Sequence, residues 1–235
     1  MPTGSSWGNL RSVPIRRVNL SVNKPVIVLG AGGHASVLVD MLRSQGVVPL
    51  ALVAPAAGAS RAVLADIPLW HDEAQILTHH PDEVELINGI GSLPGNSLRA
   101  ELFARYRALG YRFASVVSAQ AMVSAYAVLE EGVQIMAGAI IQAGARIGAN
   151  SIINTGAIVD HDCQLGGDNH VAPGAVLSGG VVTGDGVHIG TGAAVIQGIS
   201  IGAHAVVGAG ATLTRPLGSK QIAYVARGSV MLIKQ

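Results

Sequence analysis

The chain has 235 residues, with 15 Lys and Arg against 14 Asp and Glu, and aromatic residues make up only 3% of it. A balanced charge and few aromatic rings argue against a nucleic-acid-binding surface and against base-stacking platforms. The single cysteine, Cys163, excludes an internal disulfide framework, and the chain lacks the Cys pairs of a zinc ribbon. A cytoplasmic location is therefore the default expectation.

Residues 1–22 are rich in Ser, Gly, Pro and Asn, and Arg11, Arg16 and Arg17 are their only charges. This composition predicts a disordered tail. The N-terminus has no apolar core before a cleavage site, so we do not interpret it as a signal peptide. The 29 residues from Gly186 to Thr214 carry no Asp, Glu, Lys or Arg, but a regular repeat continues through them. We expect a buried solenoid there and no membrane span.

Residues 23–115 alternate apolar runs with helical patterns. We expect strands at 26–29, 47–53, 84–88 and 111–116, and helices at about 36–45, 71–77 and 97–109. Strands that alternate with helices predict a doubly wound, Rossmann-like α/β unit.

Glycines cluster where the first expected strand ends, at Gly30-x-Gly32-x-x-Ala35. Such a turn lets backbone N–H groups approach a phosphate at a helix N-terminus. An NAD site would also need an acidic residue about 20 positions further on. No Asp or Glu occurs between Asp40 and Asp66, so the phosphate of a nucleotide-linked sugar is the better interpretation; a plain tight turn is the alternative.

A period of six organises residues 116–216. From Val117 to Leu213, 16 of the 17 residues taken at this spacing are aliphatic, and Thr183 is the exception. Neither the helical nor the strand period produces this pattern, which is typical of a parallel β-helix whose stacked coils share one core. Residues 217–235 form a C-terminal extension.

Two motifs together resemble a known family. They are Gly30-Ala31-Gly32-Gly33-His34 and the stretch from Asn154 to Cys163, which ends in Asp160-His161-Asp162-Cys163. The chain resembles the sugar O- and N-acetyltransferases, which pair a nucleotide-sugar-binding domain with a left-handed β-helix. The resemblance covers roughly residues 24–215. It implies the left-handed coiling and acetyl transfer from acetyl-CoA, without a metal, to the amino group of a nucleotide-linked 4-amino sugar in glycan biosynthesis.

The resemblance also implies site residues. His161 falls on the general base and Asp162 on its acidic neighbour. The acetyl-CoA positions fall on His170, Gly179, Thr191 and Ala209. The substrate positions fall on Gly32, Gly33, His34, Gly91 and Asn154. A homotrimer is implied as well, because the family binds its coenzyme in a cleft between neighbouring β-helices, and the uncharged stretch after Gly186 leaves apolar surface for such packing.

Reasoning from the residues supports part of this assignment. His161 lies between the core positions Val159 and Cys163, so it is unlike a buried structural histidine. Histidine suits proton transfer near neutral pH, and a carboxylate neighbour raises its pKa. Either Asp160 or Asp162 could orient the ring. A coil of three hexapeptides places Gly179 one coil from His161, where its N–H could face a thioester oxygen.

Three departures from the family pattern concern binding. The acidic residues that usually follow the second strand are replaced by Ala54 and Pro55, which leaves the nucleotide base open. The usual His-Pro entry to the β-helix is Ser118-Ala119, and the closing Gly-x-Pro-Ala segment is altered at residues 226–229.

Other functions remain as alternatives at this stage. The chain could be a sialic acid O-acetyltransferase or a non-catalytic nucleotide-sugar-binding protein. A β-helical zinc carbonic anhydrase is disfavoured, because the solenoid histidines at 161, 170, 188 and 204 do not match the spacing of that family.

Overall fold

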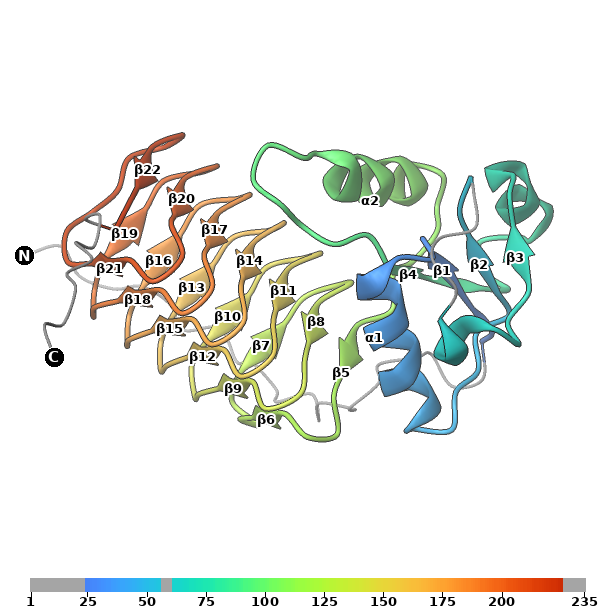
Figure 1. The fold of residues 1–235 in the computed structure, drawn as a ribbon, viewed down its shortest axis with the longest axis horizontal. Coiled ribbons are helices and arrows are strands. Elements are labelled where there is room, and N and C mark those ends of the chain that lie inside the picture. The colour runs from blue at the N-terminus through green and yellow to red at the C-terminus, as the bar shows by residue number, and fades with distance from the viewer. Residues whose placement is uncertain (1–23, 56–60, 226–235) are drawn as a thin grey trace, which may run out of the picture.

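The computed structural model describes residues 24–55 and 61–225, so the expected tail at residues 1–22 and the altered segment 226–229 lie outside the described residues. A small α/β unit is followed by a long solenoid of short strands (Figure 1). Among the described residues, we find no helix with the length and apolarity needed to cross a membrane.

The N-terminal unit has a parallel sheet with the strand order β3-β2-β1-β4. Its strands are β1 (Val26–Leu29), β2 (Ala51–Val53), β3 (Leu69–Trp70) and β4 (Glu85–Asn88). The all-apolar β1 is central, and alternate side chains point to opposite faces. Val26 and Val28 pack with helix α1 (Gly33–Arg43), whereas Ile27 and Leu29 pack with helix α2 (Leu98–Ala108).

Several element boundaries differ from those expected. Helix α1 begins three residues early, at Gly33, directly after the glycine turn. Strand β2 begins at Ala51 instead of residue 47, since Pro49 lacks the N–H that a paired strand needs. The expected helix at 71–77 is the 3₁₀ helix η2 (Glu73–Thr78), and η1 (Ala62–Leu64) and the two-residue β3 were not expected.

The expected strand at 111–116 divides between the two units. Phe113 makes a parallel bridge to Leu86 beside β4, whereas Val116 already pairs with Gln134 in the solenoid. The chain therefore passes from one sheet system to the next without a linker.

The solenoid has three parallel sheets, and each strand pairs with the strand 18 residues away, as in Ile152 with His170. The seven-stranded sheet contains β5 (Val116–Val117), β8 (Gln134–Ile135), β11 (Ile152–Ile153), β14 (His170–Val171), β17 (His188–Ile189), β20 (Val206–Val207) and β22 (Ile222–Ala223). The six-stranded sheet contains β6 (Met122–Val123), β9 (Ile140–Ile141), β12 (Ile158–Val159), β15 (Val176–Leu177), β18 (Ala194–Val195) and β21 (Thr212–Leu213). The five-stranded sheet contains β7 (Val128–Leu129), β10 (Arg146–Ile147), β13 (Gln164–Leu165), β16 (Val182–Thr183) and β19 (Ser200–Ile201).

The aliphatic residues of the six-residue period fill the interior of this solenoid, and these repeated parallel strands fit the β-helix predicted from the sequence. Thr183, the one exception, is also buried. Its hydroxyl accepts a hydrogen bond from Asn169 Nδ2 at 2.5 Å, and Asn169 Oδ1 accepts one from Val187 N–H at 2.6 Å. The polar pair is thus satisfied inside the apolar core.

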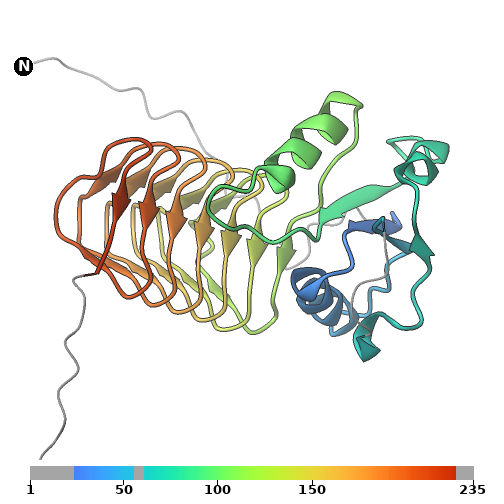
Figure 2. The same cartoon turned by 45° about the horizontal axis from the view of Figure 1, so that its top comes forward.

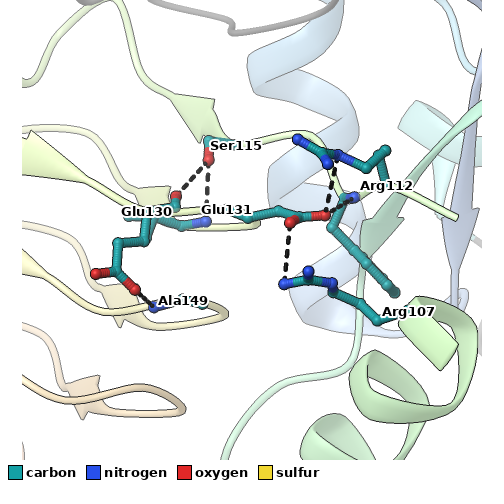
Figure 3. Close-up of polar contacts among 8 residues, drawn as sticks. Arg107, Arg112, Ser115, Glu130, Glu131 and Ala149 are labelled. Atoms are coloured by element: carbon teal, nitrogen blue, oxygen red, sulfur yellow. Dashed lines mark hydrogen bonds and ion pairs between the residues drawn. The ribbon is translucent and has the colours of Figure 1, made fainter. Parts of the chain in front are cut away.

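The two units meet at the first coils, where Glu131 binds both (Figure 3). Its carboxylate accepts a hydrogen bond from Phe113 N–H at 2.9 Å and pairs with Arg107 of α2 at 3.1 Å and Arg112 at 3.8 Å. Figure 2 shows α2 lying beside the solenoid at this end. The side chain of Glu131 is only 17% exposed, so water screens these contacts poorly.

Replacement of Glu131 tests this junction. We expect Glu131→Gln to lower the free energy of unfolding by about 1 kcal/mol, because the amide keeps an acceptor but loses both arginine pairs. Glu130→Gln is the matched control: that neighbour is 49% exposed, and its pair with Arg146 spans 3.9 Å. Urea denaturation of both variants makes the comparison, and equal losses of stability would contradict the proposed importance of the junction.

Candidate active site

His161 lies in the exposed turn between β12 and β13. Its ring Nδ1 is 2.9 Å from Asp162 Oδ2, whereas Asp160 Oδ1 accepts a hydrogen bond from the backbone N–H of His161 at 2.7 Å. The two carboxylates therefore have different contacts: Asp162 orients the imidazole, and Asp160 caps the turn.

The carboxylate of Asp162 fixes both the proton and the pKa of His161. An ionised carboxylate only accepts hydrogen bonds, so Nδ1 carries the proton and Nε2 has a free lone pair. The hydrogen bond from Asp162 and then the charge of Asp160 raise the pKa of His161 above its ordinary value, because both favour the imidazolium. Nε2 is thus a strengthened proton acceptor.

Gly179 lies against the face of His161, one coil further on. A Cβ atom at this position would come within 2.5 Å of His161 Cε1 and Nε2, so a side chain would displace the ring. Gly180 N–H donates to His161 O at 2.9 Å, which holds the two turns together. The N–H of Gly179 has no acceptor within residues 24–55 and 61–225, which leaves it able to donate to a bound oxygen.

A second polar cluster links the solenoid to the loop after β4. Asn154 Nδ2 and His170 Nε2 are 3.0 Å apart, and His170 Nδ1 lies 3.0 Å from the carbonyl oxygen of Ser92. Because a carbonyl only accepts, Nδ1 carries the proton and Nε2 accepts from the Asn154 amide. Burial, with the neighbouring ring of His188, lowers the pKa of His170 to about 4, so this ring is neutral.

A third cluster joins the glycine turn to the solenoid through His34. Gln134 Nε2 donates to Asn88 O at 2.8 Å, so Gln134 Oε1 faces His34 Nε2 at 2.7 Å. The proton of His34 is therefore on Nε2. Burial and then the charge of Arg99 lower the pKa of His34 to about 4, and the ring is a neutral group with Nδ1 as an acceptor.

The expected substrate residues of the N-terminal unit share one cavity. Gly32, Gly33, His34 and Gly91 line a volume of about 510 Å³ together with the apolar end of β2 at Ala54 and Pro55. A Cβ atom at Gly32 would meet nothing within 4 Å, so its backbone faces open space. The acidic residue in this lining, Glu73, pairs with Arg105 of α2.

The remaining expected residues lie along one edge of the solenoid, where the seven-stranded and six-stranded sheets meet. Thr191 and Ala209 occupy the same turn in successive coils, and Gly210 N–H donates to Thr191 O at 2.8 Å. Asn154 begins the equivalent turn earlier in the chain. His161 and Gly179 occupy a different edge, where the six-stranded and five-stranded sheets meet. Within one chain, a whole solenoid face separates the two sets.

Sequence reasoning missed the partners that connect these clusters, namely Ser92, Asn88, Arg99 and Gln134. Gln134 stands in the repeat as an ordinary strand residue, although it is fully buried. Asn88 precedes the glycines at the end of β4, which is the only signal that could have indicated a contact there. In the part of the chain that the structure describes, no three His, Cys, Asp or Glu side chains gather as metal ligands do.

Comparisons with known proteins place this geometry in context. The chain is 37% identical to the GDP-perosamine N-acetyltransferase of Caulobacter crescentus, solved as a histidine-to-alanine variant with CoA and GDP-perosamine; 87% of this chain and 95% of that one align, with a TM-score of 0.76. It is 28% identical to the acetyltransferase domain of PglB from Neisseria gonorrhoeae, solved with acetyl coenzyme A, over 85% and 95% of the chains, with a TM-score of 0.77. No family model and no curated protein matches.

The assigned proton positions can be tested directly. We expect ¹⁵N NMR to show His34 protonated at Nε2 and His170 at Nδ1, and both rings to stay neutral down to about pH 5, since burial lowers each pKa to about 4. Exposed His161, with its raised pKa, is the internal control and should protonate first as the pH falls. Spectra of His34→Gln and His170→Gln assign the signals, and the opposite tautomer of either ring would refute the hydrogen-bond network.

Proposed function

We propose a substrate and a mechanism for this chain, which belongs to the acetyl-CoA-dependent sugar N-acetyltransferases of the left-handed β-helix family. It transfers acetyl from acetyl-CoA to the amino group of a nucleotide-linked 4-amino sugar. Residues 23–115 form a Rossmann-like nucleotide-sugar-binding domain, and residues 116–216 form the catalytic β-helix. The observation that carries the proposal is His161, with a carboxylate on Nδ1 and a free lone pair on Nε2.

His161 acts as the general base. Nε2 takes a proton from the sugar amine as the nitrogen attacks the thioester carbon, and Asp162 stabilises the resulting imidazolium. The Gly179 N–H donates to the oxygen of the thioester as it becomes anionic. Collapse of the tetrahedral intermediate expels the CoA thiolate and leaves the amide. Crystal structures of the Caulobacter relative with one histidine replaced by alanine or by asparagine support a base of this type.

The cavity at the glycine turn binds the nucleotide. The backbone of Gly32 and Gly33 faces open space at the start of α1, where a phosphate is favoured. Neutral His34 offers only the acceptor Nδ1, so it suits a hydroxyl or N–H of the ligand and not the phosphate. Ala54 and Pro55 offer no carboxylate to the base or the ribose. We propose a GDP-linked sugar, as the 37% identical relative binds GDP-perosamine.

The active site is completed by a second subunit in a homotrimer. The outward side chains of the six-stranded sheet are apolar from Met122 through Val176, and Met122 is 60% exposed. If three such faces meet at a threefold axis, the edge carrying His161 in one subunit approaches the edge carrying Asn154 in the next. Asn154, His170, Thr191 and Ala209 of one subunit then hold acetyl-CoA against His161 and Gly179 of its neighbour.

The proposed activity predicts release of free CoA thiol when acetyl-CoA is mixed with a GDP-linked 4-amino sugar, and slower release with UDP- or dTDP-linked sugars. His161→Ala should lower kcat about 10²- to 10⁴-fold with a smaller change in KM and an unchanged thermal melt, because this exposed base acts mainly in the transition state. A stable, fully active His161→Ala enzyme would rule out the mechanism.

The pH profile adds a second readout to the same experiment. Because the raised pKa must be exceeded before the base is free, kcat/KM should fall as the pH drops through that pKa. Asp162→Asn should cost less activity than His161→Ala and move the acidic limb to lower pH. Asp160→Asn is the matched control, since its amide oxygen can still cap the His161 N–H and only its more distant charge is lost.

Subunit complementation tests the shared site. His161→Ala and Asn154→Ala subunits, each nearly inactive alone, should regain activity when unfolded together and refolded as mixed trimers, because some interfaces then carry neither substitution. Two variants at the same edge, His161→Ala and Gly179→Ala, serve as the control and should not restore one another. Monomeric wild-type protein by light scattering, or no complementation in confirmed mixed trimers, would disprove the arrangement.

A further inference from the structure

A second cavity lies at the third edge of the solenoid, away from the residues used above. Its volume is about 410 Å³, and it is enclosed between the loop 92–97 and the coils that carry Asp168, His188, His204 and Lys220. Figure 1 shows the chain between β4 and α2 extending over the solenoid here. The proposed acetyl transfer makes no use of this space.

Two buried polar atoms in its lining lack partners. Arg99 is 4% exposed; its Nε donates to Asn150 O at 3.1 Å, and its Nη1 donates to Asn88 O at 2.9 Å and Ile90 O at 2.7 Å. Arg99 Nη2 and His188 Nδ1 have no hydrogen-bond partner among the described residues, where only Arg43 Nε shares that condition. Such groups are rare in folded proteins, and two around one cavity indicate a missing polar occupant.

The charge of the lining indicates which occupant would fit. Every acceptor that Arg99 contacts is a neutral carbonyl, so no contacting carboxylate balances its charge. Burial lowers the pKa of Arg99 to about 9, and Asp168 opposes that shift, so the guanidinium stays charged at neutral pH. Lys220 adds a second positive charge at an exposed position, against the single carboxylate of Asp168.

The same wall has an apolar part. Leu93, Pro94 and Val206 line the cavity beside these charges, and the volume exceeds what an inorganic ion needs. We propose that the cavity binds a small organic oxyanion, with its carboxylate or phosphate directed at Arg99 and Lys220 and a compact apolar body against Leu93 and Val206. This site is independent of the proposed acetyl transfer.

Access to Arg99 requires the loop to move. Nη2 is closed off from solvent, so an oxyanion reaches it only when residues 93–97 shift. All five of these residues are exposed, so the shift disrupts little packing. The loop begins at Ser92, whose carbonyl accepts the Nδ1 proton of His170. Binding in the cavity therefore perturbs the His170 ring as well as that of His188.

Calorimetry with four probes on the full chain tests the site. Phenyl phosphate and benzoate combine an oxyanion with an apolar ring and separate the two anion types; inorganic phosphate lacks the ring, and phenol lacks the charge. We expect at least one of the ring-bearing anions to bind more tightly than inorganic phosphate, and phenol not to bind. Titration should shift the ¹⁵N signals of His188 and His170, and saturating acetyl-CoA should not displace the probe.

Variants locate the binding. Ala100→Leu places a larger side chain in the lining and should abolish binding, and Lys220→Asn should weaken it about fivefold while keeping a residue that tolerates the local φ of +59°. Arg215→Gln, another exposed cation, and Gly33→Ala, in the nucleotide cavity, are the matched controls. Absence of binding by both anions, or binding that survives Ala100→Leu and is lost in Gly33→Ala, would overturn the proposal.

Discussion

Stacking of each residue on the one 18 positions away is the constraint on which this structure depends. The parallel pairing fixes the register of every coil, and the aliphatic interior fills only if each coil keeps it. One register error would turn a whole set of side chains from the core to the surface. The same stacking places Gly179 on His161 and His188 on His170, so the geometry of the candidate site follows from the packing of the core.

The sequence was informative where one physical rule acts alone. The six-residue period predicted the solenoid, since burial of one aliphatic residue per strand leaves few alternatives, and it predicted that Gly179 lies one coil from His161. It failed where tertiary context decides. A two-residue strand such as β3 has no pattern of its own, and the choice between Asp160 and Asp162 depended on side-chain directions that no spacing encodes.

The polar junction between the two units was beyond sequence reasoning for the same cause. Asn88, Arg99, Gln134 and Asn150 come from four separate elements, and their pairing appears only when the sheet is placed against the coils. Each is buried, so each must find partners in the other unit. This requirement orients the N-terminal unit rigidly, because a rotation of either body would leave several amide and guanidinium groups without acceptors. The resulting alignment places the nucleotide cavity at the end of the solenoid that carries the polar side chains.

The backbone at Asp162 shows that stability and activity make opposite demands on this turn. The equivalent positions in neighbouring coils, Gly144, Gly180 and Gly198, are all glycines with positive φ, and Asp162 alone carries a side chain there, at a φ of +59°. A left-handed backbone costs a residue with a side chain about 1 kcal/mol more than it costs glycine. An aspartate in this series is therefore a residue that selection for folding alone would tend to replace. Homologues that have lost catalysis should drift toward glycine here, and a change at this one position would mark which descendants of the fold are still enzymes.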